Sequence, residues 1–224
     1  MNKPLRLVVL GAMGLHPLGG QTWLFLNWLR SFALLGHDVY YVEDRSTWPY
    51  DPVLLTRTPD CAYARGHIAS CMDRIGLPDR WALRVTDIDG ACWGMSETEL
   101  NALYRSCDAL LNVSATELHE GQLAAPFRVY VQTDPVTSEL ELANGDEYTR
   151  QAFETHDALV TYGENYGAAD CGVPLNGYRY GRTRQPIDLE FWPFAYDAEA
   201  RFFTTIGNYR QSGWDVEYDG RLYR

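Results

Sequence analysis

Residues 5–44 read LRLVVLGAMGLHPLGGQTWLFLNWLRSFALLGHDVYYVED, and this stretch decides the fold class of the chain. Its first six residues are apolar except for Arg6, too few for a helix and rich in Leu and Val, which predicts a strand buried on both faces. After a loop rich in glycine, residues 21–35 are apolar on nearly every side and stop at Gly36, as in a helix that ends at a left-handed residue. Residues 38–42 predict a second strand, so one β–α–β unit closes within this stretch.

The same alternation continues along the chain. Apolar runs predict further strands around residues 82–86, 108–113, 127–132 and 157–162. Helices are expected over residues 63–75, 96–105 and 148–155, and Ser96 and Glu99 have the spacing of a capping box. Repeated β–α units require parallel strands with helices over both faces. We therefore expect an α/β protein with a doubly wound, Rossmann-like parallel sheet, whose ligands bind beyond the carboxyl ends of the strands.

Composition and charge argue against several classes of protein. The net charge of −11 disfavours a nucleic-acid partner, because binding to a polyanion requires a cationic surface. The five cysteines are scattered without a C-x-x-C pair, so neither a zinc site nor a disulfide framework is indicated. The most apolar stretch, residues 23–35, is interrupted by polar residues and is shorter than the ~20 residues of a membrane span. We expect a cytoplasmic protein with no integral membrane segment, no metal and no nucleic-acid partner.

The loop over residues 11–20 has the composition of an anion site. It is rich in glycine and leads into a helix, so it would offer backbone N–H groups and a helix N-terminus to a diphosphate. Its glycines are spaced Gly11-x-x-Gly14 and then Gly19-Gly20, which is not the G-x-G-x-x-G of dinucleotide-binding proteins. The alternative is a tight strand-to-helix turn without a ligand.

The same residues carry a resemblance to a known family. Gly19-Gly20, the long apolar helix and the turn Leu35-Gly36-His37-Asp38-Val39 resemble the opening of the GT-B glycosyltransferases. Residues 107–113, 126–134 and 155–160 resemble later strands of the same acceptor-side domain. The likeness extends from residue 5 to about residue 170.

This resemblance implies a two-domain enzyme in which the N-terminal domain holds the acceptor and the C-terminal domain holds the nucleotide sugar. We expect residues 1–175 to form the Rossmann-like N-terminal domain and residues 176–200 to be a linker. Residues 201–224, with a strand starting at Phe202, would begin a truncated donor-binding domain. A chain without that domain is expected to be an inactive fragment.

The resemblance and the positions at the strand ends together suggest site residues. In inverting GT-B enzymes a general-base histidine occupies the loop after the first strand, which corresponds to His16, and imidazole suits proton removal from a hydroxyl. Asp134 follows a buried strand and is a candidate to orient that base, and Asp87, after another strand, is the alternative. Gly19 and Gly20 would face the phosphates of the donor. Residues after two further strands are candidates to bind substrate hydroxyls: His119, Glu120, Glu164, Asn165 and Tyr166.

The predicted function is transfer of a sugar from a nucleotide diphosphate sugar to a hydroxyl acceptor, with no separate cofactor. Two alternatives stay open at this point. A nucleotide-sugar epimerase shares the two-domain architecture. A non-catalytic Rossmann-like module is the other, in which Glu43 and Asp44, after the second strand, would grip a ribose.

Overall fold

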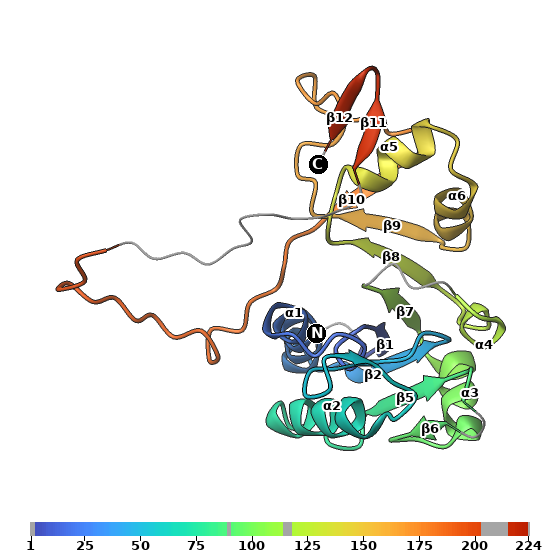
Figure 1. The fold of residues 1–224 in the computed structure, drawn as a ribbon, viewed down its shortest axis with the longest axis vertical. Helices are drawn as coiled ribbons and strands as arrows, with labels where there is room; N and C mark the ends of the chain where they lie inside the picture. The colour runs from blue at the N-terminus through green and yellow to red at the C-terminus, as the bar shows by residue number, and fades with distance from the viewer. Residues whose placement is uncertain (1–2, 89–90, 114–117, 203–214, 224) are drawn as a thin grey trace.

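A computed structural model describes residues 3–88, 91–113, 118–202 and 215–223. Its centre is one eight-stranded sheet (Figure 1). All neighbouring strands are parallel except β6, which runs antiparallel to β5. Across the sheet the strands follow the order β10 (Tyr180–Arg182), β9 (Ala158–Thr161), β8 (Arg128–Gln132), β7 (Ala109–Asn112), β1 (Arg6–Leu10), β2 (Asp38–Arg45), β5 (Trp81–Val85) and β6 (Cys92–Trp93). The chain is therefore α/β with a mostly parallel sheet, as its sequence predicts.

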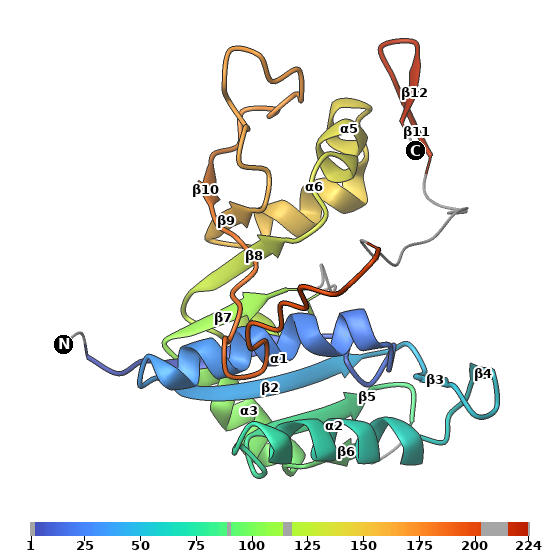
Figure 2. The same cartoon turned by 90° about the vertical axis from the view of Figure 1, so that its left-hand side faces the viewer.

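Helices cover both faces of this sheet. They are α1 (Gly19–Leu34), α2 (Ala62–Arg74), α3 (Glu97–Ser106), α4 (Glu120–Leu123), α5 (Thr137–Ala143) and α6 (Glu147–Glu154). Helices α1 and α2 pack on one face, where Phe25 and Ile68 join the same cluster as Val9. On the other face Leu100 of α3 packs with Val8, and farther along Phe153 of α6 packs with strands β8 and β9. Figure 2 shows α1 running alongside β2 and α2 alongside β5.

The ends of the helices follow local sequence signals. The Ser96 hydroxyl accepts from the Glu99 N–H at 3.3 Å, and the Glu99 carboxylate accepts from the Ser96 N–H at 2.8 Å, so the predicted capping box is confirmed. Helix α1 begins at Gly19, two residues before its predicted start. Gly36, with φ of +85°, follows the helix in the left-handed conformation that glycine adopts most readily.

The strand order contains one reversal. From β1 the chain proceeds outward to β2, β5 and β6, returns to β7 on the other side of β1, and then proceeds outward again to β10. The reversal lies between β1 and β7. In open sheets of this kind the crevice at the carboxyl ends of those two strands is the usual ligand site.

Part of the stretch expected to be a linker belongs to the folded body. Residues Tyr180–Arg182 form β10 and pair with β9. Beyond β10 the chain crosses α1, where the Asp188 carboxylate accepts from the Arg30 guanidinium at 3.0 Å and the Asp188 N–H donates to Asn27 at 3.0 Å. Trp23 packs edge-on against Trp192, with ring centroids 5.0 Å apart. Periodicity did not reveal this docking because it depends on single long-range contacts.

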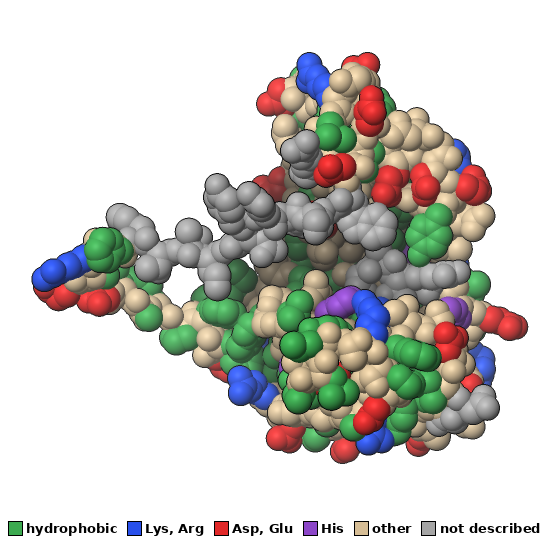
Figure 3. All heavy atoms as spheres, viewed as in Figure 1, with side chains coloured by type: hydrophobic (Ala, Val, Ile, Leu, Met, Phe, Trp, Pro, Cys, Tyr) green, Lys and Arg blue, Asp and Glu red, His purple; other side chains and the backbone are tan. Residues whose placement is uncertain are grey.

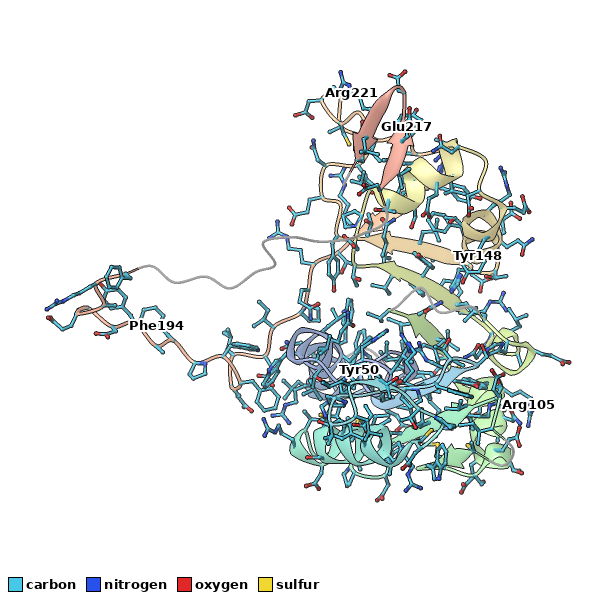
Figure 4. The ribbon with its side chains drawn as sticks, in the orientation of Figure 1. Tyr50, Arg105, Tyr148, Phe194, Glu217 and Arg221 are labelled. Carbon is cyan, nitrogen blue, oxygen red and sulfur yellow. The ribbon has the colours of Figure 1, made fainter. Side chains whose placement is uncertain are left out.

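Residues 193–202 extend away from the body. The labelled Phe194 lies on this segment in Figure 4 and is 93% exposed. The strand expected from Phe202 to residue 206 lies mostly outside the described residues. Beyond that gap, β11 (Val216–Tyr218) and β12 (Arg221–Tyr223) form an antiparallel hairpin. It packs on α5, where the Asn144 side chain donates to the Glu217 carbonyl at 2.8 Å. The division into two domains stays a prediction.

Candidate functional site

The loop after β1 is held against β2 by two close-packed glycines. A Cβ atom on Gly11 would lie 2.3 Å from the Tyr41 ring, and one on Gly14 would lie 2.7 Å from Ile68. Both distances are too short for any larger residue without displacement of the neighbour. The first two glycines of the loop therefore serve packing.

A buried carboxylate organises the same loop. Glu43 is 1% exposed and accepts from the Gly14 N–H, from the Leu15 N–H at 2.9 Å and from the Tyr41 hydroxyl at 2.5 Å. The Tyr41 hydroxyl in turn accepts from the Met13 N–H at 2.7 Å. Burial raises the pKa of Glu43, and these donors together with Arg45 oppose that rise. The N–H groups of residues 13–15 are thus occupied by the protein itself, which corrects the prediction that this part of the loop cradles an anion.

The second pair of glycines differs from the first. Gly19 and Gly20 are exposed, and a Cβ atom on either would meet nothing within 4 Å. The Thr22 N–H donates to the Leu18 carbonyl at 2.9 Å, and Leu18 provides no side-chain cap. Within the described ranges the N–H groups of Gly19, Gly20 and Gln21 have no acceptor. The start of the sixteen-residue helix α1 is therefore open to an anion.

His16 lies three residues before this open helix end. It is half-buried, and within the described part of the chain its ring makes no hydrogen bond. Burial lowers the pKa of His16, and the positive charges of Arg57 and Arg45 lower it further. A lowered pKa favours the neutral imidazole near pH 7, and only the neutral ring can accept a proton.

Asp134 does not contact His16. It is exposed and follows β8, and β7 lies between β8 and β1, so the two strands are roughly 10 Å apart at the usual strand spacing. Among the described residues no hydrogen bond joins the two side chains. The structure therefore gives no contact through which Asp134 would orient the imidazole.

The side chain of Asp44, the residue after Glu43, lies on the other face of the sheet. Its carboxylate has no exposed surface and accepts two bonds from the Arg84 guanidinium, at 2.7 and 2.8 Å, and one from the Tyr104 hydroxyl at 2.8 Å. The Glu43 carboxylate likewise accepts its hydrogen bonds from within the protein, so neither acid has an oxygen available for a ribose. The interpretation of this pair as a ribose grip is therefore wrong.

The residues after β9 divide between the surface and the core. Glu164 forms an ion pair with Arg184, and the Asn165 side chain donates to Asp170 at 3.1 Å, both at the surface. Tyr166 is 7% exposed and its hydroxyl donates to the buried Glu139 at 2.7 Å. The prediction that Tyr166 binds a substrate hydroxyl is corrected, because its hydroxyl donates to Glu139 and accepts from the Val136 N–H inside the protein.

His119 and Glu120 line a cavity of about 880 Å³ on the α3 face. They lie at the start of α4, which is fixed by Gln122, whose buried amide donates to the Asp44 carbonyl at 3.2 Å. The cavity is polar and its walls come from β5, α3 and α4. The lining residues that sequence reasoning missed include Arg84, Asn101 and Arg105, which lie inside elements rather than at strand ends. His16 does not line this cavity.

The described residues contain neither a metal-ligand cluster nor a membrane-spanning helix. No three His, Cys, Asp or Glu side chains in these ranges gather as a metal site would need. No helix there has both the length and the apolar character to cross a bilayer. Figure 3 shows acidic side chains gathered on the upper part of the molecule, which carries α5 and α6 in Figure 1.

Comparisons with known proteins give one structural likeness. No family model matches the chain, and no curated protein matches it. Among solved structures it is similar to an alpha-glucosyltransferase that was solved in complex with UDP and a 13-mer DNA containing a central A:G mismatch. The identity is 13% and the TM-score 0.45, over 85% of this chain and 42% of that one. The chain thus spans less than half the length of that enzyme, and a likeness at this level identifies no family.

Proposed function

We propose that this chain is the acceptor-side part of a GT-B glycosyltransferase, which transfers a sugar from a nucleotide diphosphate sugar to a hydroxyl group. The observation that carries the proposal is the pairing of a half-buried His16, whose pKa is lowered by burial, with the open N-terminus of α1. Both follow β1, at the strand reversal where ligands of such sheets bind.

The two features supply complementary chemistry. In an inverting reaction the acceptor oxygen attacks the anomeric carbon, the bond from that carbon to the diphosphate breaks, and the hydroxyl proton passes to His16. The leaving nucleoside diphosphate gains negative charge, which the free N–H groups of Gly19 and Gly20 and the positive end of α1 would stabilise. Asp134, exposed at the end of β8, would act on the imidazole only through the electrostatic field of its negative charge.

The polar cavity on the α3 face is separate from the His16 loop and would suit a second group of the substrate. His119, Glu120 and Asn101 offer both donors and acceptors of hydrogen bonds, which suits hydroxyl-rich groups. Glu164 and Asn165, at the end of β9, are further polar groups for the donor side. We expect most of the grip on the nucleotide to come from a donor-binding domain, so this chain alone should bind nucleotides weakly and transfer sugar slowly.

A charge substitution at the helix start tests this proposal. Gly20→Asp places a carboxylate in the first turn of α1, where it stabilises a helix by about 0.3–1 kcal/mol but repels a diphosphate. We expect ligand-observed NMR to detect UDP and UDP-sugar binding to the wild type and a loss of at least about tenfold in the variant, the equivalent of ~1.4 kcal/mol. Thermal unfolding should show that the variant is at least as stable as the wild type.

Leu35→Asp is the matched control, because it adds the same charge at the other end of the same helix. Leu35 is 72% exposed. Its substitution should leave UDP binding unchanged. Equal UDP binding by Gly20→Asp and wild type would refute the assignment of the helix start as the diphosphate site.

A further inference from the structure

The most exposed aliphatic side chains next to the site lie on a small hairpin. Strands β3 (Tyr50–Asp51) and β4 (Thr56–Arg57) pair antiparallel, and Figure 2 shows them projecting beyond the carboxyl ends of β2 and β5. Between them, the hairpin tip consists of Val53, Leu54 and Leu55, which are 76%, 60% and 74% exposed. Three consecutive aliphatic side chains in solvent at the end of a projection call for a physical reason.

The backbone holds the hairpin tip in a defined shape. The Asp51 carboxylate accepts from the Val53 N–H at 2.7 Å and from the Leu54 N–H at 3.0 Å. Leu55 has φ of +55°, a left-handed conformation in which Gly or Asn would be less strained and also more soluble. The chain therefore presents a leucine where both the backbone and water disfavour one.

Polar and interfacial groups lie directly behind the tip. Trp48 is 42% exposed, and its carbonyl accepts from the Arg57 guanidinium at 2.7 Å. Behind the tip come the pairs Asp51–Thr56 and Tyr50–Arg57, and Trp48 precedes them in the chain, so polar, cationic and aromatic groups together follow the aliphatic tip. A bilayer likewise passes from hydrocarbon to an interface in which Trp is enriched and where the phosphate groups lie.

We infer that the hairpin tip inserts into the surface of a lipid bilayer. A protein partner fits less well, because a stable interface buries about 800 Å² on each side and three side chains on a narrow convex tip cannot supply that area. A bilayer has no such requirement, since it closes around each inserted side chain. Insertion at the surface also needs no membrane-spanning helix.

The charge of the chain defines which lipid it should prefer. With a net charge of −11 the protein is repelled by anionic surfaces, so apolar insertion rather than electrostatic attraction must drive binding. We therefore expect binding to zwitterionic phosphatidylcholine vesicles that does not increase when anionic lipid is added. The Tyr50 N–H donates to the Leu15 carbonyl at 3.0 Å, so insertion would hold the His16 loop close to the membrane surface.

Vesicle sedimentation with two matched double variants tests the inference. Leu54→Asn with Leu55→Asn removes two of the three aliphatic side chains of the tip. It also reduces the backbone strain at position 55, where Asn tolerates a positive φ better than Leu, so this variant should fold at least as well as the wild type. Each buried methylene contributes a factor of about four to partition, so binding to phosphatidylcholine vesicles should fall more than about tenfold. Ile187→Asn with Leu189→Asn changes two residues of similar exposure, 60% and 75%, elsewhere on the surface and should leave binding unchanged.

A second measurement reports the depth of Trp48. Brominated phosphatidylcholine should quench tryptophan fluorescence of the wild type, and Trp48→Phe should remove most of that quenching. The inference is overturned if the wild type does not sediment with vesicles, or if both double variants lose binding equally. It is also overturned if the tip substitutions only change the oligomeric state in gel filtration. None of these outcomes depends on sugar transfer, so the lipid inference and the proposed function fail separately.

Discussion

Removal of the Tyr41 hydroxyl should be among the most costly single-atom deletions in this fold. The hydroxyl is fully buried, donates to Glu43 at 2.5 Å and accepts from the Met13 N–H at 2.7 Å. Loss of a hydrogen bond to a charged group costs about 1.5–3 kcal/mol, and the stranded Met13 N–H adds about 1–3 kcal/mol. Glu43 keeps its two backbone donors, so we expect Tyr41→Phe to lower the free energy of unfolding by about 3 kcal/mol.

Urea unfolding measures this loss, and the neighbouring tyrosine provides the control. The Tyr40 hydroxyl accepts from Arg80, whose side chain is 41% exposed, so water can replace that bond. Tyr40→Phe should therefore cost less than about 1 kcal/mol. The account of the loop is refuted if the two variants lose similar stability, or if Tyr41→Phe loses less than about 1 kcal/mol while the slope with urea is unchanged.

The same network predicts a dependence on pH. Burial raises the pKa of Glu43 above its ordinary value of 4.5, so the folded state holds its proton more tightly than the unfolded state. The stability from this group is complete below pH 4.5 and is lost as the pH rises through the folded pKa. The Tyr41 hydroxyl opposes the rise in pKa, so in Tyr41→Phe the loss should extend to higher pH than in the wild type.

Three further outcomes are expected. Gly11→Ala should lower the free energy of unfolding by about 2–3 kcal/mol, because the added methyl group would overlap the Tyr41 ring. Gly20→Ala should not lower it, and thermal unfolding of the two variants tests the difference. The His16 imidazole should titrate below pH 6.5 by NMR, and Arg57→Gln should raise that midpoint; a midpoint above 6.5 would contradict the proposed environment. Arg84→Met should lower the free energy of unfolding in urea by about 3–5 kcal/mol, because it leaves the fully buried Asp44 carboxylate without its ion-pair partner. A loss below about 1 kcal/mol would show that the pair is not buried as described.

The fold was predictable where strands are buried on both faces. Residues 5–10 are apolar except for Arg6, and residues 108–113 have an apolar centre; they contain β1 and β7, at the centre of the sheet. Strand β10 was not predictable, because Tyr180, Gly181 and Arg182 have no apolar pattern. They form a strand through their pairing with β9 at the edge of the sheet. The hairpin of β11 and β12 does have a local sequence signal. Its turn is Asp219-Gly220, with φ of +52° and +69°, a frequent turn sequence in tight hairpins.

The site was less predictable than the fold. Sequence position placed Glu43 and Asp44 at the correct edge, but adjacent strand residues face opposite sides. Glu43 therefore reaches the loop after β1, whereas Asp44 reaches Arg84 and α3, and the two cannot hold one ligand. Similarly, no local pattern distinguishes Gly14, which is closed by Ile68, from Gly20, which is open. Such differences arise from partners more than twenty residues away.

Amide chemical-shift mapping of this chain with UDP, UDP-sugars and NAD tests the central claim most directly, because it detects weak binding and locates it. We predict that UDP and UDP-sugars shift the amides of His16 and Gly19 to Gln21 at the open start of α1, and that Gly20→Asp abolishes these shifts. Shifts confined to the cavity around Arg84 and Arg105, or no shifts at millimolar nucleotide, would contradict the assignment of the nucleotide-sugar site to the edge after β1.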